Sequence, residues 1–324
     1  MLTWLGIAAA GILNGSFAVP MKTSKRWSFE QIWAAFCFLA MAVLPWLAVC
    51  LAIPGWRDIL AGLPESGLAR LIALGLVWGV ASLLYGLAID ALGVALGFSI
   101  QLGLSIIAGA LLPRFGFGAA PAGSDAVFYL GLGLMVAGVV VCAHAGREDR
   151  KGPGQADPGR IRRGLLIALA GGLGGPLLNV GIQYGITLLA NSGRNTQMGQ
   201  WVAWALFLSA ATVTQSGYCL YRVVARGSLR EYSCTGAKPE WMRVLVMAVV
   251  WAASIFLYGY SAAALGPLGT SVGWPVFIGL IVVTSNAWGV ALGEWKGKQP
   301  ARFRQMVAGN GLLIGAAFLV AQGR

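Results

Sequence analysis

Charged residues are scarce in this chain of 324 residues. Asp, Glu, Lys and Arg make up 10% of it and hydrophobic residues 58%, whereas soluble globular domains carry about 25% charged residues. A soluble protein of this size could not hide so much apolar surface, but a bilayer can. The longest polar stretch, about 146–163, is too short to build a core. The composition therefore excludes a separate soluble domain and predicts an all-α polytopic membrane protein.

Catalytic and metal-binding signatures are also missing. The sequence has one histidine, and its five cysteines are scattered, with no CxxC pair, so we interpret them as reduced apolar fillers. No GxxxxGK[ST] motif supports ATP-driven transport. The one histidine and the lack of a carboxylate near the middle of any apolar run argue against a membrane-embedded enzyme. We expect neither a cofactor nor a metal.

Long apolar runs are abundant. A membrane-spanning helix needs about 20 mostly apolar residues, and ten segments qualify. The opening run, MLTWLGIAAAGILNG, lacks the basic region of a signal peptide, so we interpret it as the first span. The expected spans are 3–21, 31–53, 68–90, 93–113, 126–145, 164–188, 198–221, 242–264, 268–292 and 304–322.

The basic residues indicate an orientation. The formal net charge is +12, and 18 of the 23 Lys and Arg residues lie in or beside the loops on one side of the predicted bundle. Basic loops stay in the cytoplasm, so both termini should face outside and the 146–163 loop should face inside. This distribution is typical of a topology signal rather than of nucleic-acid binding.

A repeated spacing indicates an internal duplication. Trp78, Tyr85 and Leu92 recur as Trp251, Tyr258 and Leu265, at an offset of 173 throughout. A weaker match relates Asn14 to Asn179 at an offset of 165. Because each copy would have five spans, the second would enter the membrane from the opposite side, as in many secondary transporters. We expect 5+5 inverted repeats at 1–150 and 164–324, joined by a cytoplasmic linker at 151–163.

Neutral polar residues lie within the expected spans. Amides and hydroxyls both donate and accept hydrogen bonds, which suits a neutral ligand rich in hydroxyls, and aromatic faces can stack on a sugar ring. The same residues also serve to bond one membrane helix to another, and both interpretations stay open for each of them. The candidates for substrate binding are Asn14, Tyr85, Gln101, Asn179, Gln183, Gln215 and Trp274.

No expected span has a carboxylate near its middle. Asp90, His144 and Glu294 are at expected cytoplasmic ends, and Lys22 ends the first span. A proton-coupled carrier needs a group whose protonation changes as access alternates. Glu294 and Asp90 are the candidates, although both could also be plain surface residues.

Glycine and proline interrupt two of the spans. GGLGGPLLN, from Gly171 to Asn179, and LGPLGTSVGWP, which enters the ninth span, should break regular helix because proline removes a backbone hydrogen bond. Such breaks often line binding sites, but close helix packing explains many of them equally well.

Several segments resemble one family. KTSKRWSFEQIW with the following LPW, VWGVASLLYGLAIDALGVALG and GEWKG are similar to the L-rhamnose–proton symporters of the drug/metabolite transporter superfamily. The resemblance covers nearly the whole chain. It implies import of L-rhamnose, or a related neutral monosaccharide, with a proton across the bacterial inner membrane. A metabolite or drug exporter of the same superfamily, or a membrane sugar sensor, remains an alternative; the oligomeric state is open.

Overall fold

The computed structural model describes residues 2–92, 94–116, 124–146, 158–193, 199–297 and 299–322, and these residues form helices with no strand among them. The first half of the chain contains α1 (Leu2–Ser16), η1 (Val19–Thr23), α2 (Phe29–Cys37), the π-helical η2 (Phe38–Val43), α3 (Leu44–Ala52), α4 (Trp56–Ala61), α5 (Glu65–Leu92), α6 (Val94–Gly116) and α7 (Asp125–Gly146). The second half contains α8 (Pro158–Gly174), α9 (Leu177–Asn191), α10 (Gln200–Ala225), η3 (Leu229–Tyr232), α11 (Lys238–Ala264), α12 (Pro267–Ser271), α13 (Gly273–Ala291) and α14 (Pro300–Gln322).

Eight helical stretches among the described residues are long and apolar enough to cross a membrane. A polytopic helical membrane protein is therefore confirmed, but the expected count of ten is not. The two expected spans outside this set correspond to α6, where the shorter stretch Ser99–Leu112 is apolar, and to α10. The latter is 26 residues long but carries the polar run Thr212–Ser216, which lowers its hydropathy.

Both predicted helix breaks are present. Chain 164–188 forms two helices, because α8 ends at Gly174 and α9 begins at Leu177, after Pro176. Chain 268–292 also divides, into α12 and α13 around Val272. The left-handed conformation of Gly266, with φ +62°, ends α11 just before Pro267 opens α12. Each break places polar residues next to a helix end inside the bundle.

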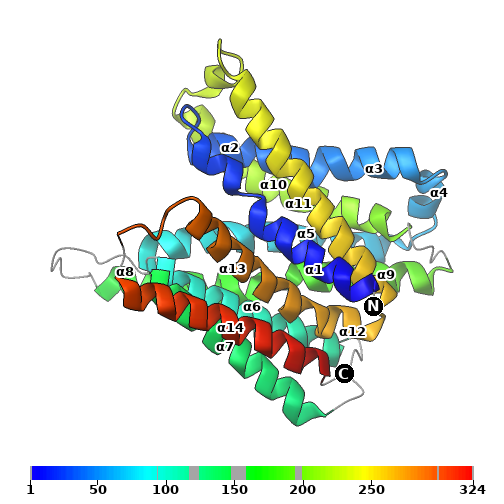
Figure 1. The fold of residues 1–324 in the computed structure, drawn as a ribbon. Coiled ribbons are helices and arrows are strands. Elements are labelled where there is room, and N and C mark those ends of the chain that lie inside the picture. The colour runs from blue at the N-terminus through cyan, green and yellow to red at the C-terminus, as the bar shows by residue number, and fades with distance from the viewer. Residues whose placement is uncertain are drawn as a thin grey trace.

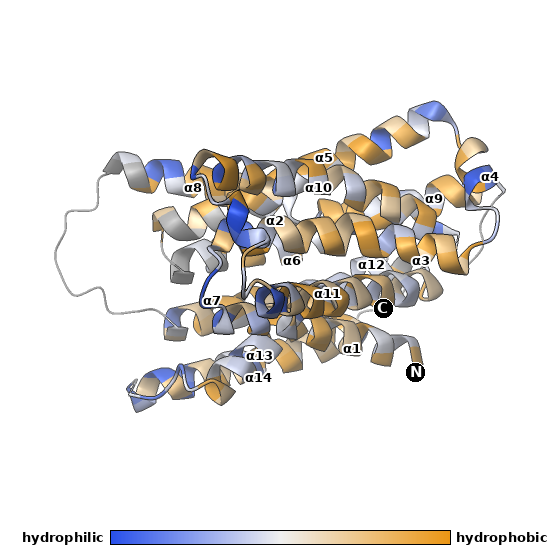
Figure 2. Cartoon of the chain, turned by 90° about the horizontal axis from the view of Figure 1, so that it is seen from above, coloured by the Kyte–Doolittle hydropathy of each residue, from blue (hydrophilic) through white to orange (hydrophobic). Residues whose placement is uncertain are grey.

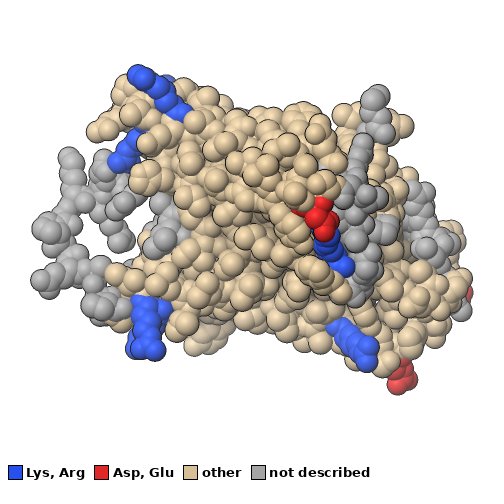
Figure 3. Space-filling view, turned by 90° about the horizontal axis from the view of Figure 1, so that it is seen from below, with Lys and Arg blue, Asp and Glu red and all other residues tan. Residues whose placement is uncertain are grey.

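The helices lie roughly side by side and give the bundle two ends, as Figure 1 shows. The terminal side is the end at which α1 begins, α4 and α12 lie, and α14 ends. The basic side is the opposite end, with η1, η3 and the start of α8. Hydrophobic residues dominate along the helices (Figure 2), and on the face in Figure 3 uncharged residues cover most of the surface between a few charged side chains.

The first helix of each half of the chain packs against helices of the other half. α1 packs against α11 and α13, while α8 packs against α5 and α6. In addition α2 packs on α10, and α7 on α14. Glycines allow the closest approaches: a Cβ at Gly11 or Gly15 of α1 would lie 2.6 Å from the Cβ of Leu280 or Thr284 on α13.

Aromatic contacts repeat this pattern. Trp78 of α5 packs on Phe207 of α10, with ring centroids 5.7 Å apart. Trp251 of α11 packs on Phe36 of α2, at 6.0 Å. Trp78 and Trp251 are the two tryptophans that the repeated spacing relates. Each therefore contacts a phenylalanine in the other half of the sequence.

Candidate functional site

A buried polar network lies toward the terminal side of the bundle. Its centre is Asn179 of α9, whose side chain is fully buried. Asn179 Nδ2 donates to the carbonyl oxygens of Gly109 on α6 and Thr270 on α12, each at 3.0 Å. Asn179 Oδ1 accepts a 2.7 Å hydrogen bond from the Tyr258 hydroxyl on α11. One side chain thus ties its own helix to three others.

Trp274 extends this network between α13 and α6. Its indole Nε1 donates to the Ser105 carbonyl oxygen at 3.0 Å, and its ring meets that of Tyr258 edge-on at 5.8 Å. The indole lies so close to α6 that a Cβ at Gly109 would overlap it. Glycine at 109 is therefore needed for the tryptophan to reach this position.

Gln183 adds a further hydrogen bond between α9 and α12. It lies one turn beyond Asn179 on α9, and its Oε1 accepts from the Thr270 hydroxyl at 3.1 Å. Its Nε2 donates to Thr187 Oγ1 at 3.5 Å. The structure therefore brings together three of the predicted site residues: Asn179, Gln183 and Trp274.

Participants in this network that were not among the predicted site residues include Tyr258, Thr270 and Ser105. Ser105 takes part through its backbone carbonyl, which no sequence pattern reports. Tyr258 could have been found, because the repeated spacing relates it to Tyr85, which was a candidate.

Gln101 of α6 has a different environment. Its side chain is 1% exposed, and neither its amide nitrogen nor its amide oxygen has a hydrogen-bond partner. A Cβ at Gly171 of α8 would overlap its Nε2, so the glycine-rich end of α8 makes room for this amide. A buried polar group without a partner costs about 1–3 kcal/mol and therefore needs an explanation.

Asn14 and Tyr85 lie away from the terminal-side network. Asn14 Nδ2 donates to Ser254 Oγ on α11 at 3.1 Å, and Ser254 Oγ in turn donates to the Ala10 carbonyl oxygen at 2.9 Å. This chain of bonds joins α1 to α11. Tyr85 lies on α5 and is partly buried.

Gln215 lies where α10 crosses α2. It is fully buried, and its Oε1 accepts from Cys37 Sγ at 3.5 Å while its Nε2 lies 3.8 Å from Met41 Sδ. Nearby, the Thr212 hydroxyl donates to the Leu208 carbonyl oxygen at 3.0 Å. The surroundings of Gln215 favour bonding between helices, and its role toward a substrate stays a prediction.

The charged candidates lie on the basic side. Glu294, just after α13, forms an ion pair with Lys22 of η1, and each side chain is 46% exposed. Asp90 falls in the last turn of α5, but its side chain lies outside the described residues. Glu240, at the start of α11, was not a candidate, yet it is 3% exposed and binds Arg243 Nη1 at 3.0 Å and the Lys25 amide at 3.3 Å.

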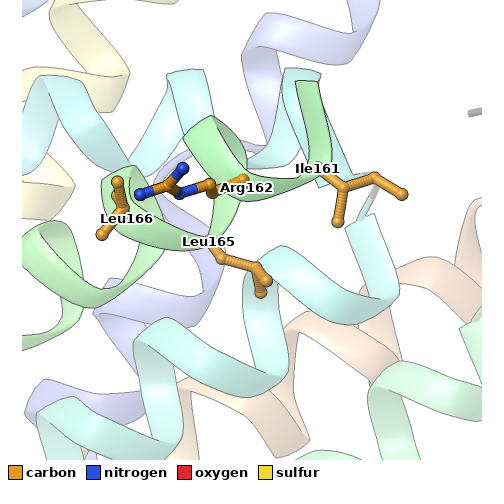
Figure 4. A pocket seen from close by; sticks show the side chains of 4 residues that line it. All are labelled: Ile161, Arg162, Leu165 and Leu166. Carbon is orange, nitrogen blue, oxygen red and sulfur yellow. The ribbon is translucent and has the colours of Figure 1, made fainter. Parts of the chain in front are cut away.

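Two surface hollows do not resemble a site for a polar ligand. The hollow in Figure 4 is lined only by Ile161, Arg162, Leu165 and Leu166, all from the start of α8. An apolar groove between α1, α13 and α14 includes Trp4, Leu280 and Phe318, and Phe318 is 66% exposed. In the described parts of the chain, no cluster of three or more His, Cys, Asp or Glu could hold a metal ion.

The apolar helices and the buried neutral polar network define the class: this is a multi-pass helical membrane protein. The family model of the L-rhamnose-proton symport protein (RhaT) matches residues 1–324. The chain therefore belongs to the L-rhamnose-proton symport protein family, a family of transporters, as the resemblance predicted.

Relatives that bear the family's name align with most or nearly all of this chain. The L-rhamnose-proton symporter of Pectobacterium atrosepticum is 24% identical, with 99% of this chain and 96% of the relative covered. That of Mannheimia succiniciproducens is 24% identical over 88% of each chain. A Yersinia pestis protein of the same name is 22% identical, with 99% of this chain and 97% of the relative covered.

Proposed function

We propose that this protein imports a neutral monosaccharide, L-rhamnose, together with a proton across the bacterial inner membrane. Membership of the L-rhamnose-proton symport family supports the substrate, the coupling ion and the direction. Relatives that bear this name align with nearly the whole chain, which extends the support to the complete transporter.

Within the structure, the observation that best supports the proposal is the unpaired amide of Gln101. An amide presents one acceptor and two donor hydrogens, so one hydroxyl-bearing ligand can satisfy both of its ends. A charged ligand would require a buried counter-charge. Among the side chains that the structure describes, the fully buried polar ones within the helix bundle are neutral, with the carboxylate of Glu240 at its basic-side edge. A neutral sugar therefore fits this environment.

The remaining pocket residues follow from the same chemistry. Asn14, Asn179, Gln183 and Gln215 supply further amides, while Tyr85 and Trp274 supply aromatic faces. Asn179, Gln183 and Trp274 have partners in this structure, so a sugar contact at these positions requires the terminal-side network to open.

The architecture that we propose is ten spans in two inverted repeats, 1–150 and 164–324, with the linker 151–163 between them. The exchange of neighbours supports it: α1 packs with α11 and α13 of the second half, and α8 packs with α5 and α6 of the first. The reciprocal Trp78–Phe207 and Trp251–Phe36 contacts give independent support. Such a relation allows the site to open alternately to either side.

The orientation that we propose has the basic side in the cytoplasm and both termini outside. The 18 of 23 basic residues in or beside the loops of that side support it. The orientation can be tested by itself with a membrane-impermeant thiol reagent applied to intact cells. A cysteine added after Arg324 should be labelled, whereas a cysteine added in the 151–163 linker, as the control, should not.

For the proton we propose Glu294 or Asp90. The Glu294–Lys22 pair joins the segment just after α13 to η1, which follows α1, so protonation of the carboxylate would weaken a contact between these two segments. Glu294→Gln should make sugar uptake less dependent on the pH gradient, and Glu65→Gln, a substitution on the terminal side, should not. If Glu294→Gln keeps normal proton dependence, Asp90→Asn becomes the decisive variant.

The function itself is tested in liposomes with an imposed pH gradient and radiolabelled L-rhamnose. We expect uptake driven by the gradient, with Gln101→Leu raising the sugar concentration for half-maximal rate about 10-fold or more, since a bonded hydroxyl is lost. Gln322→Leu at the exposed end of α14 is the matched control. Binding without uptake would indicate a sensor. Indifference to L-rhamnose with movement of apolar solutes would indicate an exporter.

A further inference from the structure

The break between α8 and α9 leaves a backbone acceptor inside the bundle. The last carbonyl groups of a helix have no donor within that helix, so the residues that follow must supply one. The Gly171 carbonyl oxygen accepts from the Gly175 amide at 2.8 Å. The Gly172 carbonyl oxygen would take its helical bond from residue 176, but Pro176 has no N–H. Since Gly172 is buried, the proline removes the regular donor of a buried carbonyl group.

Gln101 lies against this same turn of α8. A Cβ at Gly171 would overlap Gln101 Nε2, and a Cβ at Gly172 would lie 3.1 Å from the Gln101 Cα. The Gln101 side chain is 1% exposed, and neither end of its amide has a hydrogen-bond partner. A carbonyl group without its helical donor and an amide without partners therefore lie on two helices that pack together, α8 and α6.

Ser105 extends this arrangement by one turn of α6. It lies four residues beyond Gln101, and its Oγ would be 3.4 Å from a Cβ at Gly175. Its backbone carbonyl accepts the bond from the Trp274 indole, so these groups lie directly beside the terminal-side network. The break patch is the Gly172 carbonyl group together with the side chains of Gln101 and Ser105. Because the facing residues of α8 are glycines, no side chain separates its backbone from α6.

We propose that the break patch binds two neighbouring hydroxyl groups of the sugar, with the Gly172 carbonyl as an acceptor and the Gln101 amide as donor and acceptor. A hydroxyl both donates and accepts. One hydroxyl can donate to the carbonyl oxygen and accept from Gln101 Nε2, while its neighbour donates to Gln101 Oε1. Backbone groups at interrupted membrane helices bind substrates and ions in other transporters. The donor hydrogens of Gln101 disfavour a cation here.

The inference rests on the proposed import of a neutral monosaccharide, and it adds Pro176 as a positioning residue that acts through the Gly172 carbonyl. Pro176→Ala tests this role, because alanine supplies the missing N–H and can adopt the backbone conformation at 176, φ −64° and ψ −11°. The restored helical bond then competes with the sugar hydroxyl. Equilibrium binding of radiolabelled L-rhamnose to the purified full chain should weaken about fivefold. The melting temperature without sugar should stay the same or rise, whereas a purely structural role predicts that affinity falls only together with stability.

Monodeoxy analogues of L-rhamnose identify the hydroxyl that the carbonyl binds. The unmodified protein should bind the analogue without this hydroxyl more weakly than L-rhamnose, and Pro176→Ala should no longer discriminate between the two. Pro300→Ala is the matched control, because Pro300 is the exposed first residue of α14, where a helix has no intrahelical donor to lose. This control should leave both the affinity and the discrimination unchanged.

Unchanged L-rhamnose affinity in Pro176→Ala, or a loss that no deoxy analogue reproduces, would overturn the proposal and leave the import of L-rhamnose standing. Slower uptake with unchanged binding would overturn it too, because the break would then act as a hinge. If the unmodified protein binds another monosaccharide and not L-rhamnose, weaker binding of that sugar by Pro176→Ala upholds the break patch and rejects L-rhamnose as the substrate. If the unmodified protein binds no monosaccharide, both the patch and the proposed function are rejected.

Discussion

Replacing Asn179 by alanine should cost more stability than almost any other single amide in this protein. The substitution removes two donated bonds at 3.0 Å and one accepted bond at 2.7 Å, and it leaves the fully buried Tyr258 hydroxyl without this partner. Hydrogen bonds between membrane helices contribute about 0.6 kcal/mol each on average and up to about 1.7. Three such bonds and one orphaned hydroxyl give an expected loss of about 2–4 kcal/mol.

The free energy of unfolding is measured by titration with sodium dodecyl sulfate in lipid–detergent mixtures, with tryptophan fluorescence as the signal. Asn191→Ala is the matched control, because Asn191 is the exposed last residue of the same helix and should change stability by less than about 0.5 kcal/mol. If Asn179→Ala is as mild as this control, the amide does not hold the four helices together and the reasoning is refuted.

Two further outcomes follow from packing and from burial. Gly79→Ala should destabilise the protein by about 1–3 kcal/mol in the same unfolding assay, because a Cβ there would lie 2.7 Å from the Ala211 carbonyl oxygen. Gly217→Ala is the control: open space surrounds Gly217, so the free energy of unfolding should stay unchanged or rise by up to about 1 kcal/mol. Equal effects of the two substitutions would contradict the packing. Burial raises the pKa of Tyr232, which lies in η3 between two spans, to about 12. Because the folded state then holds this proton more tightly than the unfolded chain, stability should be intact below about pH 10 and fall as the pH rises toward 12, and Tyr232→Phe should lack that part of the decline.

The sequence alone determined the class of the protein and much of its local structure. The scarcity of charge and the long apolar runs require a bilayer, since no soluble core could bury them. The glycine and proline clusters determined where the helices break, because proline cannot donate the backbone hydrogen bond, and both breaks are present at Gly175–Pro176 and at Val272. The repeated Trp–Tyr–Leu spacing indicated a duplication, which stays a prediction.

The site was only partly predictable, because the same side chain serves helix packing or a ligand according to what faces it. Gln101 and Gln215 are indistinguishable by residue type, and both are buried within apolar helices. The tertiary structure surrounds Gln215 with Cys37 and Met41 but leaves the amide of Gln101 unpaired beside Gly171. Hydrophobic periodicity reports which residues face the bundle, and it carries no information on which partner each one meets.

Only the tertiary structure decided that Asn179, Tyr258 and Trp274 meet, because they come from three helices far apart in the sequence. The packing of α9 and α12 against α6 and α11 brings these side chains within reach of one another, and no local pattern in the sequence encodes that packing.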